Sequence, residues 1–330
     1  MASAGLHAPH TLQEKETAGL LLGAMKTRHV AACFTVALLS ARGANVPRFE
    51  PDPSWPKPLP NNWMLGQVSG IYVDSRDHIW VTPRTLDEND RYAQVNKADC
   101  CLPAPAVLEF DMAGNLIQGW GGPGQGYEWP DNEHGMFVDY KDNVGIGGNG
   151  MNDTDILKFT QNGKYLLQIG HHGKTGGSND TETLNRPAGI MVYPKTNEVL
   201  VADGYGSRRV IVFDADTGAY KRHWGAYGNK PDDSAPRTRS FDGPGSPQFN
   251  TVHGIRISND NLVYVGDRIN HRIQVFTIEG KFVKESYIER KTSSAEGTAF
   301  DIAFSPDKQQ RLLYVPDGSN KKVQILDRAS

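Results

Sequence analysis

Cysteine, long apolar runs and an excess of charge of either sign are all scarce in this 330-residue chain. Three cysteines are too few for a scaffold held together by disulfides. The apolar segment 30–39 is too short to cross a bilayer as a helix, so we expect no membrane span. The 35 lysines and arginines against 38 acidic residues give a net charge of −3, and we expect no nucleic-acid partner.

What the chain has instead is an internal repeat. Five segments begin at Gly70, Gly135, Gly189, Gly254 and Asp301, and each contains two β-patterned runs around a polar turn. A third run follows in every case, and a fourth follows in the first four. Four short antiparallel strands form one blade of a β-propeller. The sequence therefore predicts an all-β propeller over residues 45–330, with five blades recognisable and the last one incomplete.

Charged residues recur in the turn between the second and third strands of three repeats. They are Asp203 and Arg209, Asp267 and Arg272, and Asp317 and Lys322. Asp side chains commonly accept hydrogen bonds from nearby backbone in turns. We expect these residues to brace the turn rather than to carry chemistry.

The N-terminal 44 residues are predicted to be an extension and a signal peptide. A basic stretch begins at Met25, an apolar run covers residues 30–39, and small residues at Ala41 and Gly43 suit a cleavage site. We therefore expect the protein to be exported, to the periplasm or outside the cell.

Export makes the two remaining cysteines informative. Cys100 and Cys101 are adjacent and lie in the long connection between the second and third strands of the first blade. An oxidising compartment favours a disulfide between them, and two free thiols are the alternative.

Two histidines occupy the same position in different repeats. His134 and His253 each immediately precede the glycine that opens the innermost strand. Ring symmetry then brings both side chains toward the central axis, where a pair of imidazoles suits a zinc ion. A satisfied polar core is the alternative interpretation. For the neighbouring pair His171 and His172 we expect no ligand role, because they fall in an outer loop.

The order of these residues resembles a known family. The blade pattern is similar to the NHL repeat, and residues 65–330 resemble peptidyl-α-hydroxyglycine α-amidating lyase and its exported bacterial relatives, a six-bladed propeller family. The resemblance implies that His134 and His253 are zinc ligands. It also implies that Tyr205 is catalytic and that Arg84 and Arg268 hold the substrate carboxylate. A buried aromatic ring and salt-bridged rim arginines are the alternatives for these three residues.

The chain departs from that family in its sixth blade. There the family has its third zinc histidine, followed by an acidic residue near a structural calcium, and this sequence has no counterpart. Phe300 and Asp301 belong to the fifth blade. Two histidines alone predict weak zinc binding. An open propeller edge predicts self-association, unless the proline-rich segment 45–65 adds an edge strand to close the ring.

The function that the resemblance implies is a zinc-dependent carbon–nitrogen lyase. It would cleave an α-hydroxyglycine-like carbinolamide, a small-molecule or peptide-like substrate, into an amide and glyoxylate. Two alternatives stay open at this point. One is a metal-dependent lactone or ester hydrolase of the propeller type, and the other is a binding propeller without catalysis.

Overall fold

The computed structural model describes residues 46–84 and 100–329, and the chain divides into two units, Met1–Pro47 and Arg48–Ser330. The predicted extension and signal peptide, residues 1–44, lie outside the described residues. Every strand among the described residues belongs to the second unit. Among the described residues we find no helix with the length and apolar character needed to span a membrane.

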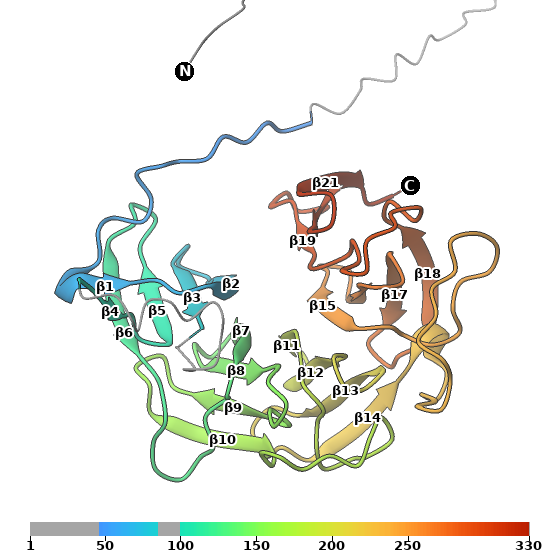
Figure 1. Ribbon diagram of the computed structural model, residues 1–330, viewed down its shortest axis with the longest axis horizontal. Coiled ribbons are helices and arrows are strands. Elements are labelled where there is room, and N and C mark those ends of the chain that lie inside the picture. Colours follow the sequence, from blue (N-terminus) through green and yellow to red (C-terminus); the bar gives the residue numbers. More distant parts are fainter. Residues whose placement is uncertain (1–45, 85–99, 330) are drawn as a thin grey trace, which may run out of the picture. The chain divides into compact units, whose positions relative to one another are not determined.

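Five antiparallel sheets follow one another along the chain, as the repeats predict (Figure 1). The first blade comprises β2 (Val68–Val73), β3 (Ile79–Pro83), β5 (Val107–Phe110) and β6 (Leu116–Trp120); the second comprises β7 (Glu133–Val138), β8 (Val144–Gly148), β9 (Asp155–Phe159) and β10 (Tyr165–Gly170). The third comprises β11 (Ile190–Tyr193), β12 (Glu198–Asp203), β13 (Arg209–Asp214) and β14 (Tyr220–Trp224); the fourth comprises β15 (Val252–Ile257), β16 (Leu262–Asp267), β17 (Arg272–Thr277) and β18 (Phe282–Tyr287). The fifth comprises β19 (Ala303–Phe304), β20 (Leu312–Asp317) and β21 (Lys322–Asp327). Within the described part of the chain the helices are two single 3₁₀ turns, η1 (Pro60–Asn62) and η3 (Ala226–Gly228), so the all-β propeller prediction is confirmed.

Apolar cores fill the spaces between neighbouring blades. Side chains alternate between the two faces of a strand, so each middle strand serves two cores. In β9, Ile156 joins the core shared with the third blade, whereas Leu157 joins the core shared with the first. Burying one such side chain stabilises the fold by roughly 1.5–3 kcal/mol. The repeated Val and Ile pattern therefore holds the blades face to face around the centre (Figure 1).

The turn residues brace the third and fourth blades as expected. Arg209 Nε donates to Asp203 Oδ2 over 2.9 Å, and Arg272 Nε donates to Asp267 Oδ2 over 2.7 Å. All four side chains are fully buried. In each blade the pair links the end of the second strand to the start of the third.

The fifth blade differs from this pattern. Its described sheet has three strands, as the sequence predicts. Asp317 braces its turn as expected, because its carboxylate accepts from the backbone N–H and Nδ2 of Asn320 over 3.1 and 2.8 Å, whereas Lys322 Nζ pairs with Glu289 Oε1 at 2.8 Å. The ammonium group is a single point charge at the surface, and it lacks the planar fork that lets arginine hold a carboxylate and several carbonyls at once.

The prediction that segment 45–65 supplies an edge strand for the ring is wrong for the described residues. Its short strand β1 (Trp63–Met64) pairs in parallel with β4 (Leu102–Pro103), which belongs to a connection within the first blade. Earlier in the segment, the ring of Phe49 lies 5.7 Å from that of Tyr314 in the fifth blade. The segment thus contacts both blades, but it adds no strand to the fifth sheet.

The two adjacent cysteines lie just before β4. Cys100 and Cys101 form a disulfide, which confirms the predicted vicinal bond. The bond fixes the end of a connection whose earlier part, residues 85–99, lies outside the described residues.

Candidate functional site

The innermost strands approach one another so closely that only glycine fits after the inward-facing position. A Cβ atom on Gly135 would lie 2.0 Å from the carbonyl oxygen of Ala188, and one on Gly189 would lie 2.6 Å from that of His253. Real Cβ atoms do not come within 3.0 Å of such an atom. This contact packs the start of each inner strand against the start of the next and gathers the preceding residues around the centre.

Two histidines and a tyrosine meet at this point. His134 in β7 and His253 in β15 have ring centroids 4.9 Å apart. Tyr205, from the turn between β12 and β13, lies between them, with its hydroxyl oxygen 3.0 Å from Nε2 of each histidine. The structure therefore brings together three residues that are far apart in the sequence.

Each histidine is tied to the blade that follows its own. His253 Nδ1 donates to the carbonyl of Phe300 over 2.5 Å, and His134 makes a backbone hydrogen bond with Ala188. Burial, followed by the positive charges of Arg84 and Arg268, lowers the pKa of His134 to about 3. Burial and the neighbouring His134 likewise lower the pKa of His253 well below its usual value. Both imidazoles are therefore neutral at neutral pH, with Nε2 lone pairs that face Tyr205.

The hydroxyl of Tyr205 cannot donate a hydrogen bond to both histidines. The hydroxyl of Tyr205 has one proton, but it faces two neutral Nε2 acceptors. Arg268 Nη1 donates to the same hydroxyl oxygen over 3.1 Å. One imidazole lone pair therefore has no proton to accept from Tyr205, which is the condition in which a bound cation is favourable.

Arg268 is held in place from two sides. Its Nε donates to the carbonyl of Glu296 and its Nη2 to the carboxylate of Glu296, both over 2.7 Å. Its guanidinium carbon lies 4.0 Å from the ring centroid of Phe300. Arg268 is therefore salt-bridged, as expected of a structural rim arginine. It also contacts Tyr205, as expected of a residue of the functional site.

Two more arginines border the same space. Arg84 Nη1 donates to Gln67 Oε1 over 2.7 Å, and its Nη2 lies 3.4 Å from Asn149 Oδ1. Arg186 Nε donates to the carbonyl of Asn149 over 2.9 Å, and its guanidinium lies 5.7 Å from the ring centroid of Tyr205. In residues 46–84 and 100–329, neither arginine forms an ion pair with a carboxylate. Both can therefore bind a ligand anion.

The donor set suits a metal that prefers imidazole. Two neutral Nε2 atoms face a common phenol oxygen, and the opposite nitrogens are fixed by carbonyl groups, an arrangement typical of histidine ligands. The equivalent positions of the other blades hold Ser69, Ala188 and Phe300, which offer no third ligand of the usual kind.

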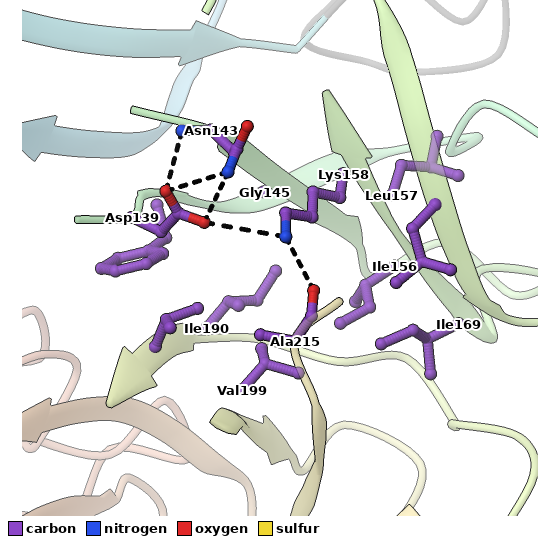
Figure 2. A pocket seen from close by; sticks show the side chains of 13 residues that line it. Asp139, Asn143, Gly145, Ile156, Leu157, Lys158, Ile169, Ile190, Val199 and Ala215 are labelled. Atoms are coloured by element: carbon purple, nitrogen blue, oxygen red, sulfur yellow. Dashed lines mark hydrogen bonds and ion pairs between the residues drawn. The ribbon is translucent and has the colours of Figure 1, made fainter. Parts of the chain in front are cut away.

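A separate crevice lies between the second and third blades (Figure 2). It has a volume of about 30 Å³ and is lined mainly by apolar side chains such as Ile156 and Ile190. Lys158 Nζ reaches across it to the carbonyl of Ala215 over 2.7 Å. A space that holds about one water molecule is too small for a substrate, so we assign it to imperfect packing between blades.

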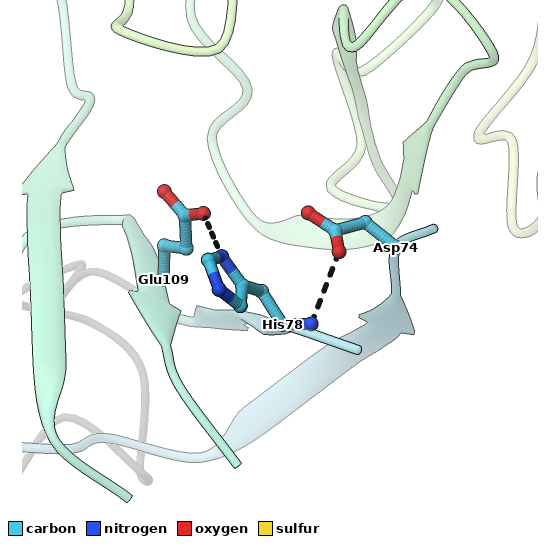
Figure 3. A group of neighbouring side chains, drawn as sticks. All are labelled: Asp74, His78 and Glu109. Carbon is cyan, nitrogen blue, oxygen red and sulfur yellow. Dashed lines mark hydrogen bonds and ion pairs between the residues drawn. The ribbon is translucent and has the colours of Figure 1, made fainter. Parts of the chain in front are cut away.

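A cluster of acidic residues and histidine in the first blade is also satisfied internally (Figure 3). His78 Nδ1 lies 2.7 Å from Glu109 Oε1, and the backbone N–H of His78 donates to Asp74 Oδ1 over 3.0 Å. Arg76 Nη2 contacts both carboxylates, at 2.5 Å from Asp74 and 3.0 Å from Glu109. The guanidinium already supplies the cation that this cluster requires.

The structure places all five predicted site residues around one space. Tyr205 contacts both histidines and Arg268, whereas Arg84 lies at the edge, where it lowers the pKa of His134 through its charge. Sequence reasoning missed Arg186. The signal in the sequence is its spacing, because Arg186 lies two residues before Ala188, which occupies the same repeat position as His134 and His253.

Comparison with known proteins agrees with the fold and the repeat. A family model for the NHL repeat matches residues 249–276. Over 251 residues the chain is 26% identical to mouse peptidyl-glycine alpha-amidating monooxygenase, covering 73% of this chain and 23% of that protein. It is 27% identical to the Xenopus laevis enzyme A over 280 residues, covering 82% and 26%. Mouse NHL repeat-containing protein 3 is 24% identical over 279 residues, covering 82% and 65%.

Solved structures show the same fold. A gluconolactonase of Xanthomonas campestris superposes with a TM-score of 0.50 at 13% identity, covering 79% of this chain and 71% of that one. The predicted resemblance is thus confirmed as an NHL-repeat propeller similar to part of the amidating monooxygenases. The chain spans about a quarter of the length of those enzymes.

Proposed function

We propose that this protein is a metal-dependent lyase that cleaves the C–N bond of an α-hydroxyglycine-like carbinolamide, releasing an amide and glyoxylate. Its distant similarity to the amidating monooxygenases supports this class of reaction. Export to the periplasm or the extracellular space is part of the proposal, since the leader pattern favours it.

The observation that carries the proposal is the position of Tyr205. Its hydroxyl lies within 3.1 Å of two neutral histidine nitrogens and one guanidinium. A phenol oxygen in this position is well placed to accept a proton from a substrate hydroxyl bound beside it.

The remaining residues fit the substrate's charge and the direction of the reaction. A carboxylate, as in hydroxyglycine, would bind between the arginines Arg84, Arg186 and Arg268 through charge-assisted hydrogen bonds. Tyr205 would take the hydroxyl proton, the C–O bond would become a carbonyl, and the C–N electron pair would pass to the amide nitrogen, which takes up a proton. His134 and His253 would hold a zinc ion, which as a Lewis acid polarises an oxygen of the substrate.

Glyoxylate release from an N-acyl-α-hydroxyglycine by the zinc-supplemented protein tests this function. We expect Tyr205→Phe to lower kcat by about a hundredfold or more, because it removes the proton acceptor while keeping the ring. Tyr193→Phe is the matched control. It also removes a hydrogen-bonded hydroxyl of the third blade, but that hydroxyl contacts Asn261, outside the site.

Two results would contradict the proposal. One is wild-type turnover in Tyr205→Phe, which would leave the tyrosine a purely structural role. The other is no glyoxylate from the zinc-loaded wild-type protein with any N-acyl-α-hydroxyglycine tested.

A further inference from the structure

The second blade breaks the charge pattern of its neighbours. In the third blade the cross-strand register pairs Val199 with Phe213 and, four residues along, Asp203 with Arg209. In the second blade Val144 pairs with Phe159. Four residues further along this pair of strands, Gly148 stands where the third blade has its aspartate, and Asp155 stands where the third blade has its arginine.

Another carboxylate takes over the role of the missing aspartate. Asp153 Oδ2 lies 2.2 Å from where a Cβ atom of Gly148 would be, so it fills the space of the absent side chain. Its oxygens accept the backbone N–H groups of Asp131 and Asn132 over 2.7 and 3.1 Å. In the third blade Asp203 accepts a backbone N–H from the equivalent connection in the same way.

The role of the arginine is not taken over by any lysine or arginine of the described chain. Asp155 is 2% exposed, and its Oδ2 has no hydrogen-bond partner among the residues that the structure describes. The second blade therefore contains two buried carboxylates at a point where the third and fourth blades contain one carboxylate and one guanidinium.

A histidine from the loop after β10 reaches this point. His172 Nδ1 lies 3.8 Å from Asp153 Oδ1 and 3.7 Å from Asp155 Oδ1, and it too has no hydrogen-bond partner. On the other side of the ring, Nε2 lies 3.4 Å from Asp131 Oδ1. One ligand atom from each of Asp131, Asp153 and His172 lies within 4.8 Å of the others, which is close to the spacing of ligands around one zinc ion.

Among the described residues, no lysine or arginine forms an ion pair with Asp153 or Asp155. The cluster of Asp74, His78 and Glu109 in the first blade (Figure 3) is the opposite case, because Arg76 forms ion pairs with both of its carboxylates.

We propose that Asp131, Asp153 and His172 form a divalent-cation site beside the buried carboxylate of Asp155, in which a metal ion replaces the buried guanidinium of the neighbouring blades. The mixture of imidazole and carboxylates favours a zinc-type ion over calcium, which prefers oxygen ligands alone. The site is distinct from the one around Tyr205 and does not depend on the proposed lyase activity. Its role is structural: it links the turn between β8 and β9 to the loop after β10.

Zinc titration of metal-free full-length protein, monitored with a competing chromophoric chelator, tests the site. We expect Asp155→Asn and His172→Gln each to weaken the binding of one zinc equivalent by at least tenfold. His171→Gln, which changes the exposed neighbouring histidine, should leave that equivalent unchanged. The same equivalent should persist in His253→Gln, which alters only the central site.

Asp155→Arg supplies a second, independent readout. It introduces the residue found at this position in the third and fourth blades, so the variant should lose the zinc equivalent, and in a His253→Gln background chelator should no longer lower its melting temperature. Unchanged zinc binding in both Asp155→Asn and His172→Gln would overturn the proposal. Loss of all zinc in His253→Gln would overturn it as well.

Discussion

The buried arginine of the third blade offers a sharp test of what holds a blade together. Arg209 is fully buried and donates to Asp203, which is also fully buried. Its two terminal nitrogens donate to the carbonyls of Ser178 and Thr183, over 3.1 and 2.7 Å. Arg209→Met keeps much of the side-chain length but leaves a buried carboxylate and several carbonyls without their donor.

We expect this change to cost about 3–5 kcal/mol of unfolding free energy, the usual penalty for leaving one partner of a buried ion pair uncompensated. Lys141→Met is the matched control. Lys141 Nζ lies 2.7 Å from Asp216, but the two side chains are 38% and 49% exposed. Exposed pairs contribute about 0–1 kcal/mol, so the control should lie within that range.

Urea-induced unfolding at neutral pH measures the unfolding free energy of each variant. The comparison requires that the free energy depend on urea concentration with the same slope in all variants. The double variant Asp203→Asn/Arg209→Met should recover part of the loss, because it removes the uncompensated charge. If Arg209→Met were within about 1 kcal/mol of Lys141→Met, the turn would not depend on its buried pair, and the reasoning would be refuted.

Other expected outcomes concern the central site and export. With chelator present, lowering the pH from 7 to 5 should destabilise the protein by about 2 kcal/mol through His134, with a further loss from His253, as measured by urea unfolding. The sign follows because both folded-state pKa values are depressed, so below about pH 6.5 the unfolded chain binds protons that the native site does not. In the glyoxylate assay, Arg84→Ala and Arg186→Gln should each raise KM about tenfold or more by removing a charge-assisted hydrogen bond to the carboxylate. Terminal sequencing of exported protein should place the first residue close to Ala44, and an intact Met1 would contradict that expectation.

The sequence predicted the blades well because their physics is local and repeated. Alternating Val and Ile with polar turns specifies each strand pair by itself. Ring symmetry then brought His134 and His253 together, although 118 intervening residues separate them. The position of Tyr205 between them required the resemblance, since a tyrosine in a turn carries no signal of its own.

Features that depend on where a loop folds could not be predicted in this way. His172 follows a β-strand in an ordinary polar loop, and nothing in its neighbours indicates that the loop turns back onto Asp155. The pairing of Lys322 with Glu289 could not be predicted for a related reason, because Glu289 approaches from another turn. The substitution of Asp155 for the blade's arginine is visible in the sequence, but only once the strand register fixes which residues are equivalent.

The hydrogen bonds that tie each histidine to the next blade make the central site sensitive to distant packing. His134 is oriented by a carbonyl of the third blade and His253 by one of the fifth. A tilt of either blade therefore turns an imidazole and alters the separation of the two Nε2 atoms. We therefore expect substitutions deep within an inter-blade core to change the affinity of the proposed metal site without changing any of its ligands.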